Sequence, residues 1–271
     1  MSKVAAIQMA SGPKVDANLR EAGRLISQAA EAGAELIVLP ENFAIMGIEE
    51  SDKIAVRESQ GDGPIQTFLS DQAKQHNVWL VGGTIPLECS DPNKILAACI
   101  VYDNKGNFVE RYDKIHLFDV DLVDTGENYI ESETIEFGEI NLKVVDSPFG
   151  KIGLAVCYDL RFPELFRGLL DLGAEIIVLP AAFTAATGKA HWESLLRARA
   201  IENITYVIAS GQGGYHLNGR ATHGDSMIID PWGAILNRIQ HGAGFTLAEV
   251  NIEYLRSRRK TFPCIQHRRM K

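Results

Sequence analysis

Cysteines are few in this chain of 271 residues, which has only Cys89, Cys99, Cys157 and Cys264. No Cys-x-x-Cys pair occurs, which argues against a disulfide scaffold and against a zinc site built from several thiolates. No uninterrupted apolar stretch approaches the roughly 18 to 20 residues that span a bilayer, and the apolar core of residues 1–9 is too short for a secretion signal. We therefore expect a cytoplasmic protein without a membrane partner, in which each thiol must be judged singly.

Charge is unevenly distributed along the chain. With 46% hydrophobic and 23% charged residues, the chain can bury a sizeable core. The net charge is −8, but residues 251–271 carry +6 and leave −14 on the rest. An acidic body repels phosphates, and the basic tail has no groove-reading or base-stacking motif, so we expect no nucleic-acid partner. The tail is expected to pack on an acidic surface of its own chain or of a partner subunit.

Two segments of the chain occur twice in the same order. Ala-Glu-Leu-Ile-Val-Leu-Pro at 34–40 returns as Ala-Glu-Ile-Ile-Val-Leu-Pro at 174–180, and the turn Asp-Asn-Lys-Gly at 103–106 returns as Asp-Pro-Trp-Gly at 230–233. The offsets, 140 and 127 residues, differ by the length of a loop. The second half is therefore predicted to repeat the architecture of the first.

Each half has the pattern strand, helix, strand, helix, strand, strand, hairpin, strand. We expect halves of about 1–140 and 141–250, followed by the tail, within a single domain of 1–271. Two sheets of buried strands, each covered by helices on one face, would join into an α/β four-layer α-β-β-α sandwich. The expected helices include one after a candidate N-cap at Asp16, one from Pro64, one over 165–172 and one over 191–203.

Cys157 closes the apolar run 152–156 and precedes a polar segment that ends in Pro163 and Glu164. The pattern places the thiol where a buried strand turns into a helix. The N-terminus of a helix favours a thiolate and can hold the oxyanion that forms when sulfur attacks a carbonyl. The alternative is an inert core cysteine, because free cysteine is often buried.

Glu41 and Lys114 break the symmetry of the repeat. Glu41 directly follows the strand of the first repeated segment, where the second copy has Ala181. A half-buried carboxylate at a strand end could serve as a general base, although a solvated loop acid is the ordinary alternative. Lys114 lies between large hydrophobic residues, and its ordinary alternative is a surface lysine that covers them with its stem.

Together the three segments resemble the nitrilase superfamily of carbon-nitrogen hydrolases. The motifs that carry the resemblance are Pro-Glu-Asn at 40–42, Tyr-Asp-Lys-Ile-His-Leu at 112–117 and Gly-Leu-Ala-Val-Cys-Tyr-Asp-Leu-Arg-Phe-Pro-Glu at 153–164. The resemblance runs nearly end to end and implies the same four-layer sandwich. It also implies cleavage of an amide without a metal or an organic cofactor.

The resemblance assigns roles to these residues. Glu41 would take the proton of Cys157 as sulfur attacks the carbonyl, while the Lys114 ammonium and the Tyr158 backbone N–H would face the oxyanion. The nearby ammonium is also expected to favour the thiolate. Water would then hydrolyse the thioester, with Glu41 as the base.

A second glutamate is implied between the lysine and the cysteine, as in the amidase branches of the superfamily. The run Tyr-Ile-Glu-Ser at 129–132 places it at Glu131. Glu127, Glu133 and Glu136 are competing candidates.

Residues 188–203 and 262–269 resemble the Nit-type amidases, whose substrates include deaminated glutathione and alpha-ketoglutaramate. We expect deaminated glutathione to be the substrate, with alpha-ketoglutaramate, a carbamoyl compound or a nitrile as alternatives. Both named substrates are small-molecule amides that carry carboxylates, which suit a guanidinium such as that of Arg161. An ion pair of Arg161 with Glu164 or Asp159 is the alternative.

Phe183 and Thr184 follow a strand and are expected to line the pocket. Asp225 stands where Nit-type amidases commonly have histidine, and it could alter substrate preference if its loop faces the pocket. The resemblance further implies a homodimer or larger homo-oligomer, with 163–172 and the tail as candidate interfaces.

Two other classes of protein are alternatives for this sequence. A papain-like protease would use His191 or His223 with Cys157, but it would explain neither the repeat nor Glu41 and Lys114. A catalytically silent scaffold is opposed by the intact trio.

Overall fold

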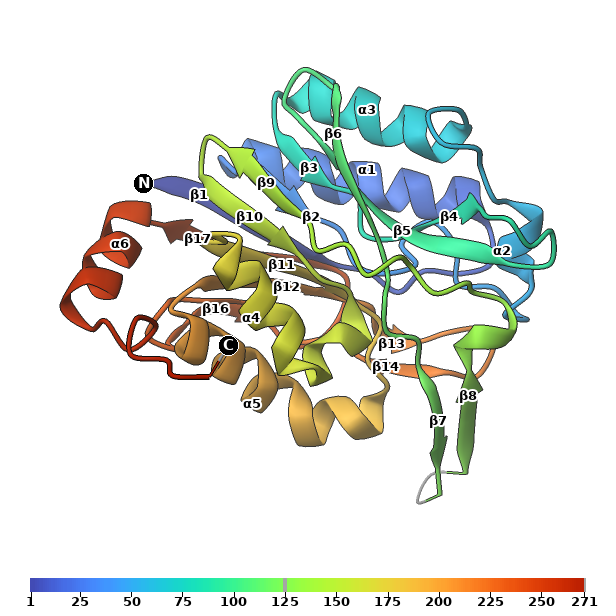
Figure 1. The fold of residues 1–271 in the computed structure, drawn as a ribbon. Helices are drawn as coiled ribbons and strands as arrows, with labels where there is room; N and C mark the ends of the chain where they lie inside the picture. The colour runs from blue at the N-terminus through green and yellow to red at the C-terminus, as the bar shows by residue number, and fades with distance from the viewer. Residues whose placement is uncertain (124–125, 271) are drawn as a thin grey trace.

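Two large β-sheets form the centre of the molecule. The computed structural model describes residues 1–123 and 126–270 (Figure 1). The strands of the first sheet are β1 (Ser2–Gln8), β2 (Leu36–Val38), β3 (Trp79–Val81), β4 (Ile85–Glu88), β5 (Ile95–Tyr102), β6 (Phe108–Asp113) and β17 (Gly244–Val250). Those of the second are β9 (Val144–Ser147), β10 (Gly150–Leu154), β11 (Ile176–Ala181), β12 (Tyr206–Gly211), β15 (Ser226–Ile229) and β16 (Ile235–Ile239).

Helices cover the outer face of each sheet. Figure 1 shows α1 and α3 over the first sheet and α4 and α5 over the second. The helices are α1 (Val15–Glu31), α2 (Asp52–Ala55), α3 (Pro64–His76), α4 (Pro163–Asp171), α5 (Ala185–Asn203) and α6 (Ile252–Thr261), with 3-10 turns at Glu131–Glu133 and Cys157–Arg161. Two small hairpins complete the fold: β7 (Asp119–Leu122) with β8 (Glu127–Ile130), and β13 (Gly213–Tyr215) with β14 (Ala221–His223).

The side chains of β1 show how the four layers pack. Ala5 and Ile7 lie in a buried cluster with the apolar faces of α1 and α3. Val4 and Ala6 point the other way, into a larger cluster that includes residues of the second sheet. Because successive strand residues face opposite sides, each inner strand is buried on both faces. The predicted α-β-β-α sandwich is confirmed.

The order of strands in the two sheets agrees with the repeat. The first sheet contains β1-β2-β3-β5 with β6 next to β5, and the second contains β10-β11-β12-β15-β16. The repeated turns are also built alike. Asp103 Oδ1 accepts N–H groups of Lys105 and Asn107 at 2.8 and 2.9 Å, and Asp230 Oδ1 accepts those of Trp232 and Ala234 at 2.9 and 2.8 Å.

One strand of the second half lies in the first sheet. β17 pairs antiparallel with β1 over its whole length, and β9 pairs in the same way with β10. The two sheets are therefore joined by one strand, β17, which crosses from the second half into the first sheet, as well as by face-to-face packing.

Two expected helix starts differ from the structure. α1 begins at Val15 without a side-chain cap, so Asp16 lies inside its first turn, where a carboxylate still interacts favourably with the helix dipole. α5 begins at Ala185 rather than near His191, because the Thr184 hydroxyl accepts the Thr187 N–H at 3.3 Å and caps the helix. α3 begins at Pro64 as predicted.

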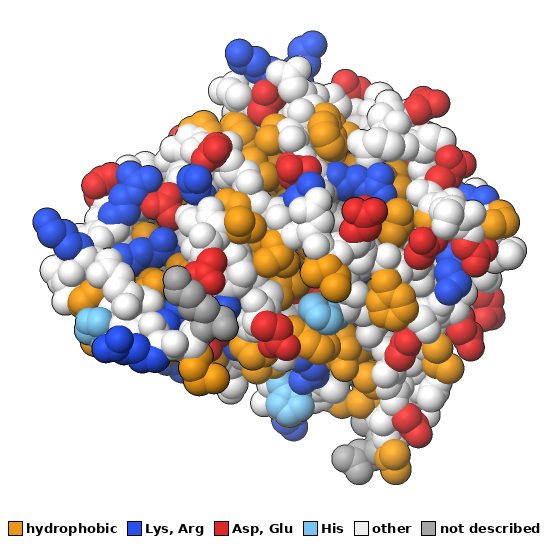
Figure 2. All heavy atoms as spheres, viewed as in Figure 1, with side chains coloured by type: hydrophobic (Ala, Val, Ile, Leu, Met, Phe, Trp, Pro, Cys, Tyr) orange, Lys and Arg blue, Asp and Glu red, His pale blue; other side chains and the backbone are white. Residues whose placement is uncertain are grey.

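The basic tail packs on its own chain. Arg256 Nε lies 2.7 Å from Glu175 Oε1, Arg259 donates to the carbonyl of Ile204 at 3.0 Å, and Arg268 pairs with Asp171. Figure 2 shows lysine and arginine side chains gathered on the side of the molecule where Figure 1 places α6. Glu175 and Asp171 thus give the tail an acidic surface on its own chain, which is the first of the two expected surfaces.

Candidate active site

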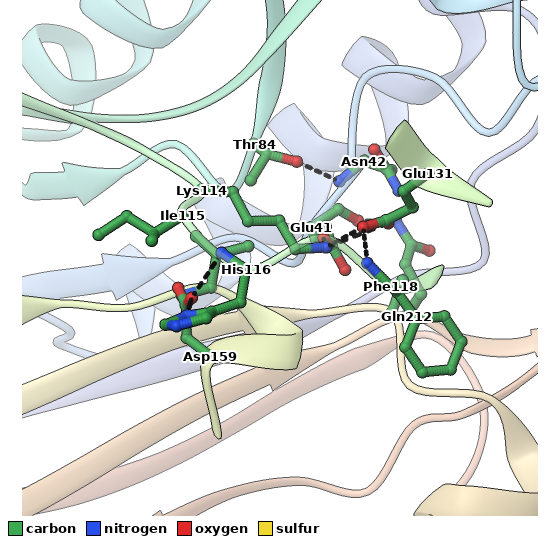
Figure 3. A network of polar contacts seen from close by, with 12 residues as sticks. Glu41, Asn42, Thr84, Lys114, Ile115, His116, Phe118, Glu131, Asp159 and Gln212 are labelled. Atoms are coloured by element: carbon green, nitrogen blue, oxygen red, sulfur yellow. Dashed lines mark hydrogen bonds and ion pairs between the residues drawn. The ribbon is translucent and has the colours of Figure 1, made fainter. Parts of the chain in front are cut away.

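Glu41, Lys114 and Cys157 each follow the end of a strand, and the fold brings these ends together. Glu41 comes after β2, Lys114 after β6 and Cys157 after β10. Lys114 Nζ lies 2.8 Å from Glu41 Oε1 (Figure 3), and the two side chains are 0% and 4% exposed, respectively. Cys157 is also buried and lines a small pocket. Neither ordinary alternative, a solvated acid or a surface lysine, describes this arrangement.

Glu131 binds the same Lys114 ammonium. Its Oε1 and Oε2 atoms lie 3.0 and 2.8 Å from Lys114 Nζ, and Oε2 also accepts the Phe118 N–H at 2.8 Å (Figure 3). Among the competing glutamates, Glu133 is exposed, Glu127 accepts from the Tyr129 hydroxyl, and Glu136 lies near Ser90. Glu131 is the glutamate that the fold joins to Glu41 and Lys114.

The two carboxylates hold the lysine as a cation. Burial by itself would lower the pKa of Lys114, but Glu131 and Glu41 outweigh it and raise that pKa well above its ordinary value. Burial likewise opposes ionisation of Glu131, yet the Lys114 ammonium lowers the pKa of Glu131 below its ordinary value. The site thus keeps a fixed positive charge between carboxylates at neutral pH.

The backbone presents Cys157 differently from the expected helix start. β10 ends at Leu154, Cys157 begins a 3-10 turn with φ of 46°, and α4 starts only at Pro163. A left-handed conformation is uncommon for a residue with a side chain and persists only where neighbours enforce it. The Cys157 thiol therefore sits on a strained turn, and the dipole of α4 does not act on it directly.

Asp159 holds this turn in place. It is fully buried, and its Oδ2 accepts the Val156 N–H at 2.8 Å and the Tyr112 hydroxyl at 2.7 Å. Its Oδ1 lies 2.7 Å from His116 Nδ1 (Figure 3). Asp159 thereby connects the cysteine motif with both ends of the lysine motif. The sequence motifs contain Tyr112, His116 and Asp159, but the only role that the sequence suggested among them was an ion pair of Asp159 with Arg161.

The Cys157 thiol is protonated at neutral pH in this structure. Burial and the Glu41 carboxylate raise the pKa of Cys157 well above its ordinary value, and the opposing effect of Lys114 is smaller. Lys114 does lower the pKa of Cys157, as expected of a nearby ammonium, but burial has the largest effect and the Glu41 carboxylate beside the same sulfur adds to it. The free site therefore holds a thiol. Such a thiol needs a base at the moment of attack.

A Glu41→Gln variant separates these two electrostatic effects. We expect the pKa of Cys157 to fall, since the carboxylate that raises it is gone and Lys114 remains, while amide hydrolysis is lost with the base. The pKa is measured from the pH dependence of iodoacetamide alkylation, with peptide mapping to read Cys157 alone. A pKa that rises, or hydrolysis that survives, would contradict this account.

The Glu41 backbone is fixed by three neighbours. Gln212 Nε2 donates to the Glu41 carbonyl at 3.0 Å, and Thr84 Oγ1 accepts the Asn42 N–H at 2.9 Å (Figure 3). Gly83 has φ of 58°, and a Cβ there would collide with the carbonyl oxygen of Pro40. Only glycine lets the two chain segments approach this closely.

The pocket beside Cys157 is narrow and mostly apolar. Its volume is about 10 Å³, and its walls include Phe118, Tyr158, Phe183, Thr184 and Arg220. Phe183 and Thr184, which the sequence suggested as wall residues, are among them, and so is Tyr158, which was expected to supply its backbone N–H. Arg220 was not foreseen.

Arg161 lies behind two of these walls. Its guanidinium carbon is 5.8 Å from the centre of the Tyr158 ring and 5.4 Å from that of Phe183, and its Nη1 lies 3.2 Å from His191 Nδ1. Asp159, one of its two expected structural partners, is engaged by Tyr112 and His116 instead. Arg161 is thus near the pocket but is not among the described residues that line it.

Asp225 belongs to a different environment. It is buried and paired with Arg238, whose Nε lies 2.8 Å from Asp225 Oδ1. Its carbonyl accepts the Trp192 indole N–H at 2.8 Å. Among the described residues it does not line the pocket at Cys157, so the carboxylate is neutralised away from that pocket.

Within residues 1–123 and 126–270, no group of three or more His, Cys, Asp or Glu side chains is arranged to hold a metal ion. No helix there is both long enough and apolar enough to cross a membrane.

A buried glutamate–lysine pair beside a cysteine on a strained turn, within an α-β-β-α sandwich, defines a class of thiol hydrolase. Residues 3–260 match the model of the carbon-nitrogen hydrolase family, and the chain belongs to that family. It is therefore an enzyme that hydrolyses carbon–nitrogen bonds.

Named relatives are similar over nearly the whole chain. A deaminated glutathione amidase of Synechocystis sp. is 44% identical over 266 residues, covering 97% of this chain and 97% of that protein. The human deaminated glutathione amidase is 40% identical over 269 residues, covering 98% of this chain and 82% of that protein. Saccharomyces cerevisiae Nit3, described as a member of branch 10 of the nitrilase superfamily, has a structure that superposes with a TM-score of 0.88 at 31% identity, covering 99% of this chain and 97% of that one.

Proposed function

We propose that this enzyme is an amidase that hydrolyses deaminated glutathione through a thioester on Cys157. The observation that carries the proposal is the contact of Glu41 and Glu131 with one buried Lys114 ammonium beside that thiol. The substrate is supported by full-length similarity to proteins named deaminated glutathione amidase.

The first half of the reaction forms the thioester. Glu41 accepts the thiol proton as Cys157 sulfur bonds to the amide carbon, and the carbonyl oxygen becomes an oxyanion. The Lys114 ammonium and the Tyr158 N–H stabilise that negative charge. When the tetrahedral intermediate collapses, Glu41 returns its proton to the departing nitrogen, and the C–N bond breaks.

The second half regenerates the enzyme. Glu41, again a carboxylate, takes a proton from water as its oxygen attacks the thioester, and the acid product leaves as the thiol is restored. Glu131 acts as a positioning residue, because it binds Lys114 and the Phe118 N–H. These steps use the three side chains, one backbone N–H and a water molecule.

The direct test is formation of 2-oxoglutarate from deaminated glutathione and, separately, from alpha-ketoglutaramate. Both amides give this product, so one assay reports both. We expect faster turnover of deaminated glutathione, with the Cys157→Ala protein as the blank. Preference for alpha-ketoglutaramate would make the enzyme an omega-amidase, and no product from either would overturn the substrate assignment.

We further propose that Arg161 binds the carboxylate next to the keto group, which both substrates carry. The Arg161 guanidinium lies over the Tyr158 and Phe183 rings, which supports this role, since a small side-chain movement would bring the guanidinium into the pocket. Arg161→Leu should lower kcat/KM about 10- to 100-fold for both substrates, the range of a hydrogen-bonded charge pair. Arg161→Lys keeps the charge but loses the two-pronged guanidinium, so its kcat/KM should lie between that of wild type and that of Arg161→Leu. Unchanged kinetics with both substrates would remove Arg161 from the site.

The assembly and location of the enzyme are also proposals. We propose a cytoplasmic homodimer or larger homo-oligomer that acts on a small molecule. α4 and the tail are candidate interfaces, although Arg256 and Arg268 already bind their own chain. A monomer in light scattering at micromolar concentration would refute the oligomer.

A further inference from the structure

Arg220 places a buried guanidinium in the wall of the active-site pocket. It follows a tight turn that closes with the His216 N–H donating to the Arg220 carbonyl at 2.9 Å, just before β14. Its side chain is only 10% exposed and lies 4.7 Å from the centre of the Tyr129 ring. A charged group is buried at a cost unless it has partners.

The partners of Arg220 leave its buried Nε donor unused. Nη2 donates to the Ala182 carbonyl at 3.3 Å, and Nη1 lies 3.7 Å from Glu50 Oε1, beyond hydrogen-bond distance. Nε is buried and has no hydrogen-bond partner, the only side-chain nitrogen in this state within residues 1–123 and 126–270. An unused buried donor on a cation, in a substrate pocket, is suited to an anionic group of the substrate.

A second cavity meets the pocket at this residue. It has a volume of about 430 Å³ and lies between residues 48–50, β8 and the turn before β14. Arg220 and Glu131 line both spaces. The pocket at Cys157 holds only about 10 Å³, so the larger part of a substrate needs the second cavity. Cavities of a few hundred Å³ accommodate small organic groups.

The position of Glu131 tells which part of the substrate enters this cavity. Burial alone would lower the pKa of Arg220, but its acidic neighbours, Glu131 and Glu41 among them, raise that pKa, so the end of the cavity that Arg220 lines is near the Glu41 carboxylate. Glu41 is the proposed donor of the proton to the departing nitrogen. The leaving amine therefore faces this cavity, and the acyl group remains at Cys157.

The charges around the cavity leave Arg220 available. Glu50 is 2.7 Å from Lys53, which lowers the pKa of Glu50 to about 2, and Glu131 is neutralised by Lys114. Glu49 and Glu133 are exposed at the rim, where solvent and salt screen them. Glu127, the remaining acid of the lining, accepts from the Tyr129 hydroxyl at 3.2 Å. Arg220 is the only cation among the described residues that line either space.

We infer that Arg220 binds a carboxylate on the leaving amine and so selects amides whose departing group is an anionic peptide rather than ammonia. The inference rests on the proposed function. In deaminated glutathione, this carboxylate is the C-terminal one of the departing cysteinylglycine. Alpha-ketoglutaramate has the same acyl part but releases only ammonia.

The test compares three substrates with wild-type enzyme and Arg220→Gln: deaminated glutathione, its C-terminal amide and alpha-ketoglutaramate. We expect the variant to lose about 10- to 100-fold in kcat/KM for deaminated glutathione, mainly through KM. The ratio of kcat/KM for deaminated glutathione to that for alpha-ketoglutaramate should fall by a similar factor. Wild type should prefer the acid to the C-terminal amide, and Arg220→Gln should not distinguish them.

Other outcomes overturn the inference in recognisable ways. An equal loss with all three substrates would make Arg220 a structural residue of the wall, and a wild type indifferent to the C-terminal amide would exclude the carboxylate contact. Arg220→Lys, which keeps the charge near Glu50, should shift the same ratio to a smaller extent if Arg220→Gln does not fold. Failure of wild type to hydrolyse either natural amide would instead overturn the proposed function itself.

Discussion

Cys157→Ala should reduce amide hydrolysis by at least about 10⁵-fold while leaving the fold intact. When catalytic residues act together, removing the nucleophile alone lowers kcat about as much as removing all of them. The comparison is the kcat/KM of purified wild type and variant on the better of the two amides, with circular dichroism to confirm folding.

Cys99→Ala is the matched control for that variant. Cys99 is also buried, and burial strongly raises its pKa, but it lies in β5 within the core cluster rather than in the pocket. The kcat/KM of Cys99→Ala should stay within about twofold of wild type, because substitutions outside the active site act mainly on stability. Substantial hydrolysis by Cys157→Ala, or an equal loss in Cys99→Ala, would contradict a thioester mechanism.

Lys114→Met should both inactivate and destabilise the enzyme. The variant leaves Glu41 and Glu131 buried without their shared cation, and removing one partner of a buried ion pair costs about 3–5 kcal/mol of unfolding free energy. Loss of the oxyanion partner should lower kcat by about 10²- to 10³-fold. Urea denaturation and steady-state kinetics measure the two effects separately.

The pH dependence of this destabilisation has a definite sign. Because Lys114 lowers the pKa of Glu131 in the folded protein, the stability that Glu131 contributes is present above its unfolded pKa and is lost as pH falls through the folded pKa. The raised pKa of Lys114 means that its own contribution is lost only when pH rises through that folded value. The stability gap between wild type and Lys114→Met should therefore shrink as the solution is acidified from neutral pH.

Two further variants make this prediction specific. Lys53→Met is the matched control, because Lys53 is also buried but its ion pair within the described part of the chain is with the half-exposed Glu50, so its loss should cost less. Adding Glu131→Gln to Lys114→Met should recover part of the stability and none of the activity. A Lys114→Met protein as stable as wild type at neutral pH would contradict the shared-cation arrangement.

The fold was largely predictable because it depends on local pattern. The repeated segments at 34–40 and 174–180 became the strands β2 and β11, and the repeated Asp-x-x-Gly turns became equivalent hairpins. Buried parallel strands show as short apolar runs, and a turn that needs glycine shows as glycine. The helix start at Ala185 was missed because its cap, Thr184, stands ahead of a segment without a clear apolar stripe.

The site was predictable only where its residues lie in compact motifs. Glu41, Lys114 and Cys157 lie at strand ends, which the apolar runs mark. Asp159 could have been suspected, since an acid so close to a strand-end cysteine is available to hold the turn. Arg220 left no such signal, because Asn-Gly-Arg after a polar segment indicates an ordinary solvated turn, and only the tertiary fold buries it beside Tyr129.

The charge state of the Cys157 thiol could not be predicted from the sequence either. The charge state of Cys157 depends on burial and on two charged neighbours, and the sequence shows that both neighbours exist but not how deeply the sulfur is buried or which neighbour has the larger effect. In the structure Glu41 has the larger effect on the pKa of Cys157. This reverses the expected thiolate and makes Glu41 essential as a base.

The central claim, a thioester on Cys157, is tested most directly by trapping it. Wild-type enzyme is mixed briefly with deaminated glutathione, quenched with acid and examined by intact and peptide mass spectrometry. The account predicts one 2-oxoglutaryl group on the peptide that contains Cys157, which is absent from Cys157→Ala and disappears once substrate is exhausted. Accumulation of 2-oxoglutarate with the enzyme unmodified under single-turnover conditions, or with the acyl group on another residue, would contradict it.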